Sequence, residues 1–382
     1  MNNPKSCGII GGGQLGMMLL EAAKVENNDV QYTILEAQED CPARPLADGF
    51  ILGSLTDENA LNALANVSDV LTWEIEHIGV DTLIELESQG KTIIPKPGVL
   101  KIIQDKGIQK EYFVSHGIPT APFVLKNQND AWDLDRFTGE KVVLKSRTGG
   151  YDGKGVAIVS KKDLLEGKTP FQGNVLIEQF AENVKELALI VAVDTQGNLG
   201  TYPAIDMYFN PQSNLVEFLY SPSKVETNLL QQAQAIAEKV VASFQSPGLF
   251  AVEMFITESN EVWVNEIAPR PHNSGHHSIE GFETSQFAQL NRILLGLELG
   301  SMALKCPSAM INIVGPEDFS GTYQLAENVY WETQKDVFVH MYGKSETRPN
   351  RKLGHVTVTA EDLEKLLLRA QEVQTKLRII PS

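Results

Sequence analysis

The first hundred residues alternate short apolar runs with stretches that carry apolar residues at helical spacing. The apolar runs, which we expect to be strands, are CGII, QYTILE, SDVLTWE and KTIIP, at residues 7–10, 31–36, 68–74 and 91–95. Helical spacing follows the first three runs, at residues 17–24, 58–65 and 80–89. This alternation predicts a parallel sheet covered by helices, in a Rossmann-like α/β domain over residues 1–97.

The pattern changes after PKPG at residues 95–98, where we place a domain boundary. A helical stretch spans residues 98–116, and strand-like runs then dominate, which is typical of an α+β domain. These runs are KVVLK, GVAIV, NVLIEQF and ELALIVAVD, at residues 141–145, 155–159, 174–180 and 186–194. NVLIEQF, taken in isolation, is typical of an edge strand.

Further along, an amphipathic helix is predicted over residues 224–244, followed by a hairpin formed by 248–257 and 261–268. A helix over 284–299 closes this central domain, which we place at 98–299. Residues 300–382 are predicted to form a small β-rich C-terminal domain that ends in a charged helix.

The composition narrows the possible partners and the compartment. The chain has 382 residues and a formal net charge of −17, which disfavours nucleic acid as a partner. Three scattered cysteines, Cys7, Cys41 and Cys306, fit free thiols in a reducing compartment. The N-terminus has no signal-peptide pattern, and no apolar run reaches membrane-spanning length, so we expect a cytoplasmic protein without a membrane partner.

The glycine-rich turn GGGQLG at residues 11–16 lies between a predicted strand and a predicted helix. It matches the G-x-G-x-x-G pattern of dinucleotide-binding folds, and Glu36 stands where such folds bind ribose. The same turn could receive a phosphate monoester at the helix N-terminus, or it could bind nothing. The pattern alone leaves all three interpretations open.

A second glycine-rich segment, RTGGYDGKG at residues 147–155, connects two predicted strands. A Walker loop would lead into a helix, so this segment is typical of a flap over a nucleotide triphosphate. Lys145 and Lys154 would balance the phosphate charge. The alternative is a solvated hairpin whose glycines serve only backbone conformation.

Downstream, Glu253 and Glu266 lie on the two arms of the predicted hairpin, with Asn265 adjacent. Two acids on neighbouring strands, flanked by apolar residues, are suited to Mg²⁺. The following loop, NEIAPRPHNSGHHS at residues 265–278, concentrates polar donors, and a basic cluster occupies residues 342–355. Each of these features also has an interpretation without a ligand. The glutamates could form salt bridges, the loop could simply lie at the surface, and the basic cluster could be a solvated turn.

Taken together, YDGKG, EQF, the two acids, PRPHNSGH and RKLGH resemble the ATP-grasp superfamily and, within it, the 5-(carboxyamino)imidazole ribonucleotide synthase family. The resemblance covers residues 7–357. It implies an ATP-grasp central domain and an ATP-, Mg²⁺- and bicarbonate-dependent carbon–nitrogen ligase without biotin. The substrate implied is 5-aminoimidazole ribonucleotide, carboxylated through carboxyphosphate in purine biosynthesis. The resemblance also implies a homodimer.

The resemblance carries functional roles onto individual residues. The ATP contacts it implies are Lys106, Lys145, Gly150, Tyr151, Asp152, Gly153, Lys154, Gly155, Val156, Glu178, Gln179, Phe180, Ala181, Glu186, Asn265 and Glu266. The substrate contacts are Gly13, Gln14, Leu15, Glu76, Tyr151, Lys154, Arg270, His272, Asn273, Ser274, Lys344 and Arg351. Asp152, Lys344, Arg351 and His272 would be catalytic. Glu253 and Glu266 would hold Mg²⁺.

Two positions depart from the family pattern. Lys106 stands where an arginine is usual, which keeps the charge but loses the planar fork. Phe209 stands where a histidine is usual, and Asp206 replaces a glutamate. Two alternatives remain open: another ATP-grasp ligase, such as a formate-dependent glycinamide ribonucleotide enzyme, and an NAD-dependent oxidoreductase built on the first glycine turn.

Overall fold

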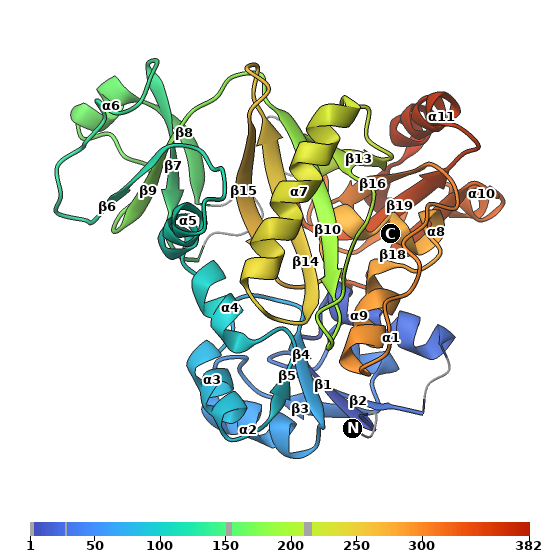
Figure 1. The fold of residues 1–382 in the computed structure, drawn as a ribbon. Helices are drawn as coiled ribbons and strands as arrows, with labels where there is room; N and C mark the ends of the chain where they lie inside the picture. Colours follow the sequence, from blue (N-terminus) through green and yellow to red (C-terminus); the bar gives the residue numbers. More distant parts are fainter. Residues whose placement is uncertain (1–3, 27–28, 150–154, 210–215) are drawn as a thin grey trace.

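The computed structural model describes residues 4–26, 29–149, 155–209 and 216–382. The N-terminal part is a parallel sheet with strand order β3-β2-β1-β4-β5, as predicted. Its strands are β1 Ser6–Ile10, β2 Gln31–Glu36, β3 Gly49–Leu52, β4 Val70–Trp73 and β5 Thr92–Ile93. Helices α1 Gln14–Val25, α2 Glu58–Asn66 and α3 Val80–Ser88 alternate with the strands, as the hydrophobic pattern predicted (Figure 1). Strand β3, which pairs with β2, was not among the predicted strands.

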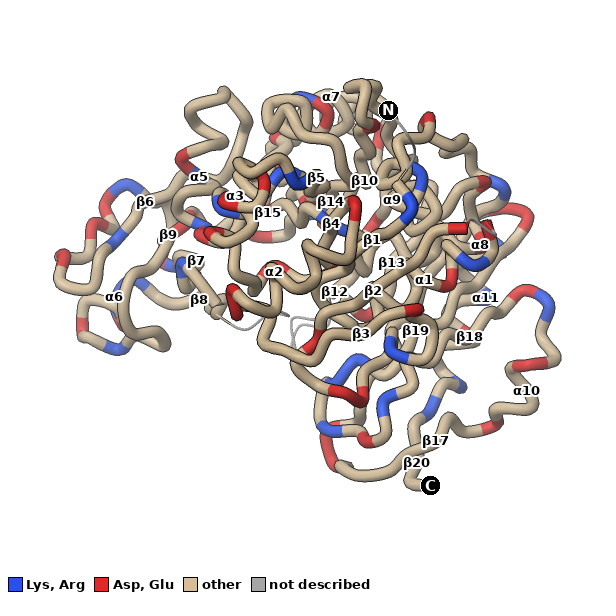
Figure 2. The backbone as a smooth tube through the Cα atoms, turned by 90° about the horizontal axis from the view of Figure 1, so that it is seen from below, with Lys and Arg blue, Asp and Glu red and all other residues tan. Residues whose placement is uncertain are grey.

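A small antiparallel sheet, order β6-β9-β7-β8, lies to one side of the molecule (Figures 1 and 2). Its elements are β6 Phe123–Lys126, β7 Lys141–Ser146, β8 Val156–Ser160, β9 Val175–Gln179 and the short helix α6 Lys161–Leu165. Strand β9 pairs with both β6 and β7, so the prediction that NVLIEQF is an edge strand was wrong. Its run of buried residues fits an interior position.

The predicted helix over 98–116 is two helices, α4 Pro97–Ile103 and α5 Lys106–Ser115. Asp105 separates them, because its carboxylate accepts hydrogen bonds from the backbone N–H groups of Gly107 and Ile108. An aspartate in this position caps a new helix rather than continuing the old one. Both helices lie between the N-terminal part and the small sheet (Figure 1).

The largest sheet has the order β15-β14-β10-β12-β13-β16-β19-β18, with β11 on β10. The strands are β10 Lys185–Val193, β11 Leu199–Thr201, β12 Ile205–Phe209, β13 Val216–Ser221, β14 Gly248–Ile256, β15 Val262–Ala268, β16 Ser308–Val314, β18 Val337–Met341 and β19 Lys352–Thr359. Strand β16 pairs with β13, so the C-terminal strands extend the central sheet directly. Strands β17 Tyr323–Leu325 and β20 Ile379–Pro381 form a separate pair.

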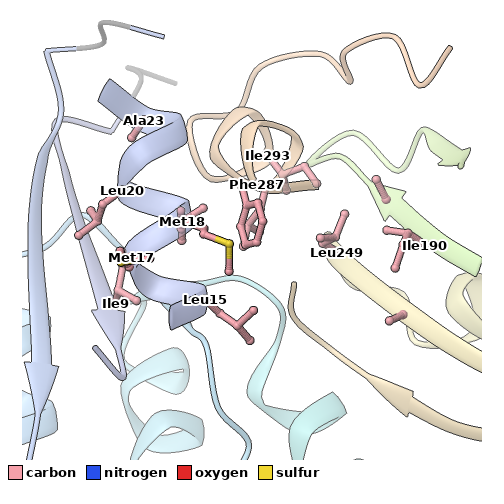
Figure 3. Packing of buried hydrophobic residues seen from close by; sticks show 14 of the residues in the cluster. Ile9, Leu15, Met17, Met18, Leu20, Ala23, Ile190, Leu249, Phe287 and Ile293 are labelled. Carbon is pink, nitrogen blue, oxygen red and sulfur yellow. The ribbon is translucent and has the colours of Figure 1, made fainter. Parts of the chain in front are cut away.

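Helices pack on this sheet and join it to the N-terminal part. They are α7 Thr227–Ser243, α8 Ser278–Gly281, α9 Gln286–Leu294, α10 Asn328–Glu332 and α11 Leu363–Lys376. Helix α7 covers β10, β14 and β15, and α9 packs against α1 (Figure 1). Figure 3 shows Phe287 of α9 beside Met18 of α1, within a buried apolar cluster that reaches the central sheet. The N-terminal part is thereby held against the sheet.

Acidic positions are spread over every part of the tube in Figure 2, so the negative net charge is distributed over the molecule. Within the described residues, no helix is both long and apolar enough to cross a bilayer.

The contact between α1 and α9 leads to a stability prediction. Phe287 is about 1% exposed, so Phe287→Ala should leave a cavity at this contact and lower the free energy of unfolding by about 3–5 kcal/mol. Urea denaturation measures the loss. Val25→Ala at the end of α1 is the control, because Val25 is 86% exposed and should change stability by less than about 0.5 kcal/mol. Equal losses in the two variants would contradict this packing.

Candidate active site

A β-bulge places the two predicted metal ligands on one face of the central sheet. Glu253 of β14 pairs with Glu266 of β15, whereas the next pair is Met254 with Val264, so Asn265 is an extra residue. The bulge shifts by one residue the alternation of buried and partly exposed side chains along β15. Val264 is buried in the core, whereas Asn265 and Glu266 are both only partly buried and lie outside the core. With regular alternation, Glu266 would point into the apolar core beneath α7.

Lysines from two elements meet this acidic face. The Lys145 ammonium lies 2.7 Å from the Glu178 carboxylate and donates to Asn265 Oδ1, also at 2.7 Å. Lys106, at the start of α5, forms an ion pair with Glu266. The predicted residues from β7, β9, α5 and β15 therefore lie together where the small sheet meets the large one.

The acids of this group differ in how their surroundings shift their pKa values. Burial raises the pKa of Glu253, and the neighbouring Glu266 and Glu186 carboxylates raise it further. The Lys106 ammonium lowers the pKa of Glu266. Burial raises the pKa of Glu186 to about 7, with only partial compensation from Lys145. Among the described residues, Glu266 thus pairs with an ammonium group, whereas the group in ion-pair range of Glu253 is the His272 ring.

The same residues can be tested for their fit to Mg²⁺. Mg²⁺ in phosphate-transferring sites takes one or two carboxylates, and phosphate and water oxygens complete its shell. Glu253 and Glu266 supply such a pair, with the amide of Asn265 next to them. Within the described ranges, no group of three His, Cys, Asp or Glu side chains could hold a metal on its own. The pair fits an ion that arrives with a nucleotide.

The donor-rich loop borders the acid pair. His272 lies with Nε2 3.4 Å from Glu253, and its Nδ1 lies 2.9 Å from Ser274 Oγ. Gln286 fixes the backbone of this loop, since its side chain accepts from His272 N and donates to His272 O. Arg270 forms a 2.6 Å ion pair with Glu76. The N-terminal part and the loop therefore meet at residues that were predicted to bind substrate.

Asn273 and the basic turn lie near this loop. Asn273 Nδ2 is buried without a hydrogen-bond partner in the described part of the chain, so it is a candidate donor to a ligand. Lys344 donates to Lys352 O at 2.7 Å, and Arg351 donates to Glu346 O. His355, beside this turn in β19, lies with its ring centroid 4.8 Å from that of His276. This contact brings the RKLGH and PRPHNSGH segments together.

The first glycine turn is closed by carboxylates from its own domain. Glu74 accepts hydrogen bonds from the N–H groups of Gly13, Leu15 and Gly16, at 2.7–3.0 Å. Glu36 accepts from Gly12 N at 2.9 Å. A pyrophosphate needs these same N–H groups and would meet two acids, so the structure argues against the dinucleotide interpretation. Gly13, Gln14 and Leu15 line the start of α1 beside this cap.

The remaining predicted residues fall in three places. Gly150, Tyr151, Asp152, Gly153 and Lys154 lie outside the described residues; Lys145 and Val156, which flank them, pair across β7 and β8. Gln179, Phe180 and Ala181 follow β9, and Gln179 bonds to the backbone of Thr138. Gly155 has a φ of +81°, which favours glycine.

The segment that departs from the family pattern lies in β12. Asp206 accepts from Lys224 N and pairs with the Ser223 hydroxyl, so its carboxylate is used locally. Phe209 packs against the apolar cluster that includes buried side chains of α1 and α9.

Sequence reasoning missed Glu74 and Lys110, which are both buried. The signal for Lys110 was its position four residues after Lys106, which places both lysines on one face of a helix. Glu74 carried no comparable signal, because only the packing of β4 against α1 reveals its partners.

Comparisons with known proteins agree with this geometry. Residues 111–287 match the ATP-grasp domain family, residues 4–104 the ribonucleotide synthetase preATP-grasp domain, and residues 308–369 the phosphoribosylaminoimidazole carboxylase C-terminal domain. The chain is therefore an ATP-grasp protein.

A solved N5-carboxyaminoimidazole ribonucleotide synthetase from Thermotoga maritima is 38% identical, with a TM-score of 0.89 over 99% of this chain and 100% of that one. The chain belongs to the N5-carboxyaminoimidazole ribonucleotide synthase family.

Two other relatives add detail. The Aspergillus clavatus enzyme, solved in complex with ADP and 5-aminoimidazole ribonucleotide, is 31% identical, with a TM-score of 0.84 over 98% of each chain. The chloroplastic phosphoribosylaminoimidazole carboxylase of Vigna aconitifolia is 37% identical over 94% of this chain. The chain spans 65% of the length of that relative.

The raised pKa of Glu253 predicts that binding of Mg-ADP near neutral pH releases protons. A bound cation favours the ionised carboxylate, so a proton held by Glu253 or Glu186 must leave. Calorimetry at pH 7 in phosphate and in Tris should give different binding enthalpies. Glu253→Gln should reduce this difference, and Glu261→Gln, in the exposed turn of the same hairpin, should preserve it. Equal enthalpies in both buffers for the unaltered protein would contradict the prediction.

Glu74→Gln tests the cap on α1. The amide has one acceptor oxygen where the carboxylate has two, so at least one buried N–H loses its partner. We expect a loss of about 1–3 kcal/mol in the free energy of unfolding. Glu58→Gln, in the exposed first turn of α2, should be close to neutral. If the two variants unfold at the same urea concentration, the Glu74 cap contributes nothing to stability.

Proposed function

We propose that the protein catalyses the ATP- and bicarbonate-dependent carboxylation of 5-aminoimidazole ribonucleotide. Bicarbonate attacks the γ-phosphoryl group of ATP, which gives carboxyphosphate and ADP. Carboxyphosphate then delivers CO₂ to the exocyclic amine of the substrate, which loses a proton, and the N5-carboxylated nucleotide and phosphate form. The observation that carries this proposal is the approach of two lysines to the Glu253–Glu266 pair, in a chain that belongs to the synthase family. Lys106 pairs with Glu266, and Lys145 donates to the adjacent Asn265.

Each part of the site has a role in this proposal. Lys145 and Lys106 bind phosphate oxygens, and Glu186 accepts from the ribose. Glu253 and Glu266 hold Mg²⁺, which would supply positive charge to the phosphates when it is bound. The segment Gln179–Ala181, together with Glu178, provides the adenine edge through its backbone.

The orientation of the nucleotide substrate follows from the charges around it. The N–H groups of the glycine turn already donate hydrogen bonds to Glu74 and Glu36. The substrate phosphate is therefore better placed at the basic turn, with Lys344 and Arg351. Arg270, His272, Asn273, Ser274 and Glu76 would then surround the ribose and the imidazole. Carboxyphosphate reacts with water, so the amine must be held next to it in a closed site. Asp152 is the proposed hydrogen-bond acceptor of that amine.

Three further features belong to this proposal. The chain is divided into domains at 1–97, 98–299 and 300–382, it works as a homodimer, and it resides in the cytoplasm. Its partners are the three small substrates, with no nucleic acid.

An assay of ADP release tests the reaction. We expect release that requires ATP, Mg²⁺, bicarbonate and 5-aminoimidazole ribonucleotide together, with incorporation of labelled bicarbonate into an acid-labile product. Glu253→Gln should lower kcat by about 100-fold or more, since it removes one of the two carboxylates that would hold Mg²⁺ at the reacting phosphates. Glu261→Gln should retain the rate of the unaltered protein. ADP release that depends on formate and glycinamide ribonucleotide would instead assign the chain to the other ligase class.

A further inference from the structure

Lys110 is a buried lysine next to the site that no step of the proposed reaction uses. It lies on α5, one helical turn after Lys106, and its side chain is about 2% exposed. Its ammonium lies 2.6 Å from Glu178 Oε1 and donates to Thr120 Oγ1 and to Val264 O. One ion pair and two hydrogen bonds therefore surround this buried ammonium group.

Glu178 connects Lys110 to Lys145. Val143 of β7 pairs with Glu178 of β9, and Lys145 lies two residues along on the same face, so Lys145 and Glu178 are diagonal neighbours. The carboxylate places one oxygen 2.6 Å from Lys110 and the other 2.7 Å from Lys145. All three side chains are at most 8% exposed, so the position of Glu178 depends on both cations.

Lys110 also holds the second partner of Lys145. Its contact with Val264 O is supported by Thr120, whose hydroxyl donates to the same oxygen at 2.7 Å. Val264 directly precedes the bulged Asn265, which accepts from Lys145. Lys110 is therefore linked to both groups that orient Lys145, one in the small sheet and one in the large sheet.

We propose that Lys110 is a positioning residue for the phosphate contact of ATP. By holding Glu178 and the Val264–Asn265 backbone, it directs the ammonium group of Lys145 toward the nucleotide and keeps the small sheet against β15. This inference rests on the proposed function only in taking Lys145 as the phosphate contact.

Removal of the Lys110 charge has two consequences. In Lys110→Met, Lys145 loses the fixed geometry of its partners, so the Kd of Mg-ADP and the KM for ATP should rise roughly tenfold or more. Glu178 also loses one of two adjacent cations, so the acidic limb of kcat/KM for ATP should move to higher pH. The charged groups around Glu178 are Lys106 and Lys110 from α5, Lys145 from β7, Glu266 from β15 and Glu253 from β14.

The experiment compares three variants by calorimetry with Mg-ADP, by thermal unfolding and by pH-dependent kinetics. Lys101→Met is the matched control, because this lysine of the neighbouring helix α4 is exposed and pairs only with Asp81 among the described residues. Lys110→Met with Glu178→Gln restores the charge balance, so it should unfold closer to the unaltered protein than Lys110→Met does. Its affinity for Mg-ADP should stay low, because neither change restores the fixed geometry of Lys145 and the Glu178→Gln change also removes its ionic partner.

The outcomes separate the two proposals. Normal Mg-ADP affinity and an unshifted acidic limb in Lys110→Met would overturn the positioning role. Full recovery of affinity in the double variant would also overturn it, since the lysine would then matter only for stability. If the unaltered protein binds Mg-ADP but shows no ADP release with 5-aminoimidazole ribonucleotide, the substrate assignment fails, and the calorimetric comparison still decides the role of Lys110.

Discussion

The site depends on one constraint, which is that charges removed from water must be balanced by charges held in fixed positions. Burying an unpaired ion costs several kcal/mol, whereas the same ion beside a partner with good geometry is tolerated. Burial opposes ionisation of Glu178, but the ammonium groups of Lys110 and Lys145 outweigh burial and lower its pKa to about 2. A carboxylate fixed between two lysines in turn fixes both of them. The approach of the small sheet to the large one follows from this balance.

The same constraint explains why the glycine turn of the N-terminal part does not bind a dinucleotide. A helix N-terminus with exposed N–H groups attracts an anion, and in this chain Glu74 is that anion. Burial raises the pKa of Glu74, while the hydrogen bonds from Gly16 and Gly13 oppose the rise. The glycines of the G-x-G-x-x-G pattern therefore serve the tight turn between β1 and α1. The ligand that such a turn holds in other folds is replaced by an internal carboxylate.

These cases show which parts of the molecule the sequence could predict. The parallel sheet, the hairpin and helix α7 could be predicted from apolar periodicity. A strand or helix that packs through one face must repeat apolar residues at its own period. The pairing of β13 with β16 did not follow, because it joins strands nearly a hundred residues apart with no local signal. The bulge at Asn265 could not be predicted either, since the residues of β15 read equally well as a regular strand. The hairpin pattern and then the family resemblance both pointed to Glu253 and Glu266, but their common face depends on the bulge.

The bulge has one more consequence, which concerns how the site treats positive charge. It places two carboxylates opposite each other, where mutual repulsion would raise both pKa values if nothing intervened. Lys106 pairs with Glu266 and lowers its pKa, so Glu266 stays ionised. Burial and the neighbouring carboxylates raise the pKa of Glu253. Another close neighbour of Glu253 is the His272 ring, with Nε2 at 3.4 Å. Among the residues that the structure describes, the ammonium group of Lys106 pairs with one of the two carboxylates, and a cation that arrives with a nucleotide would balance the second.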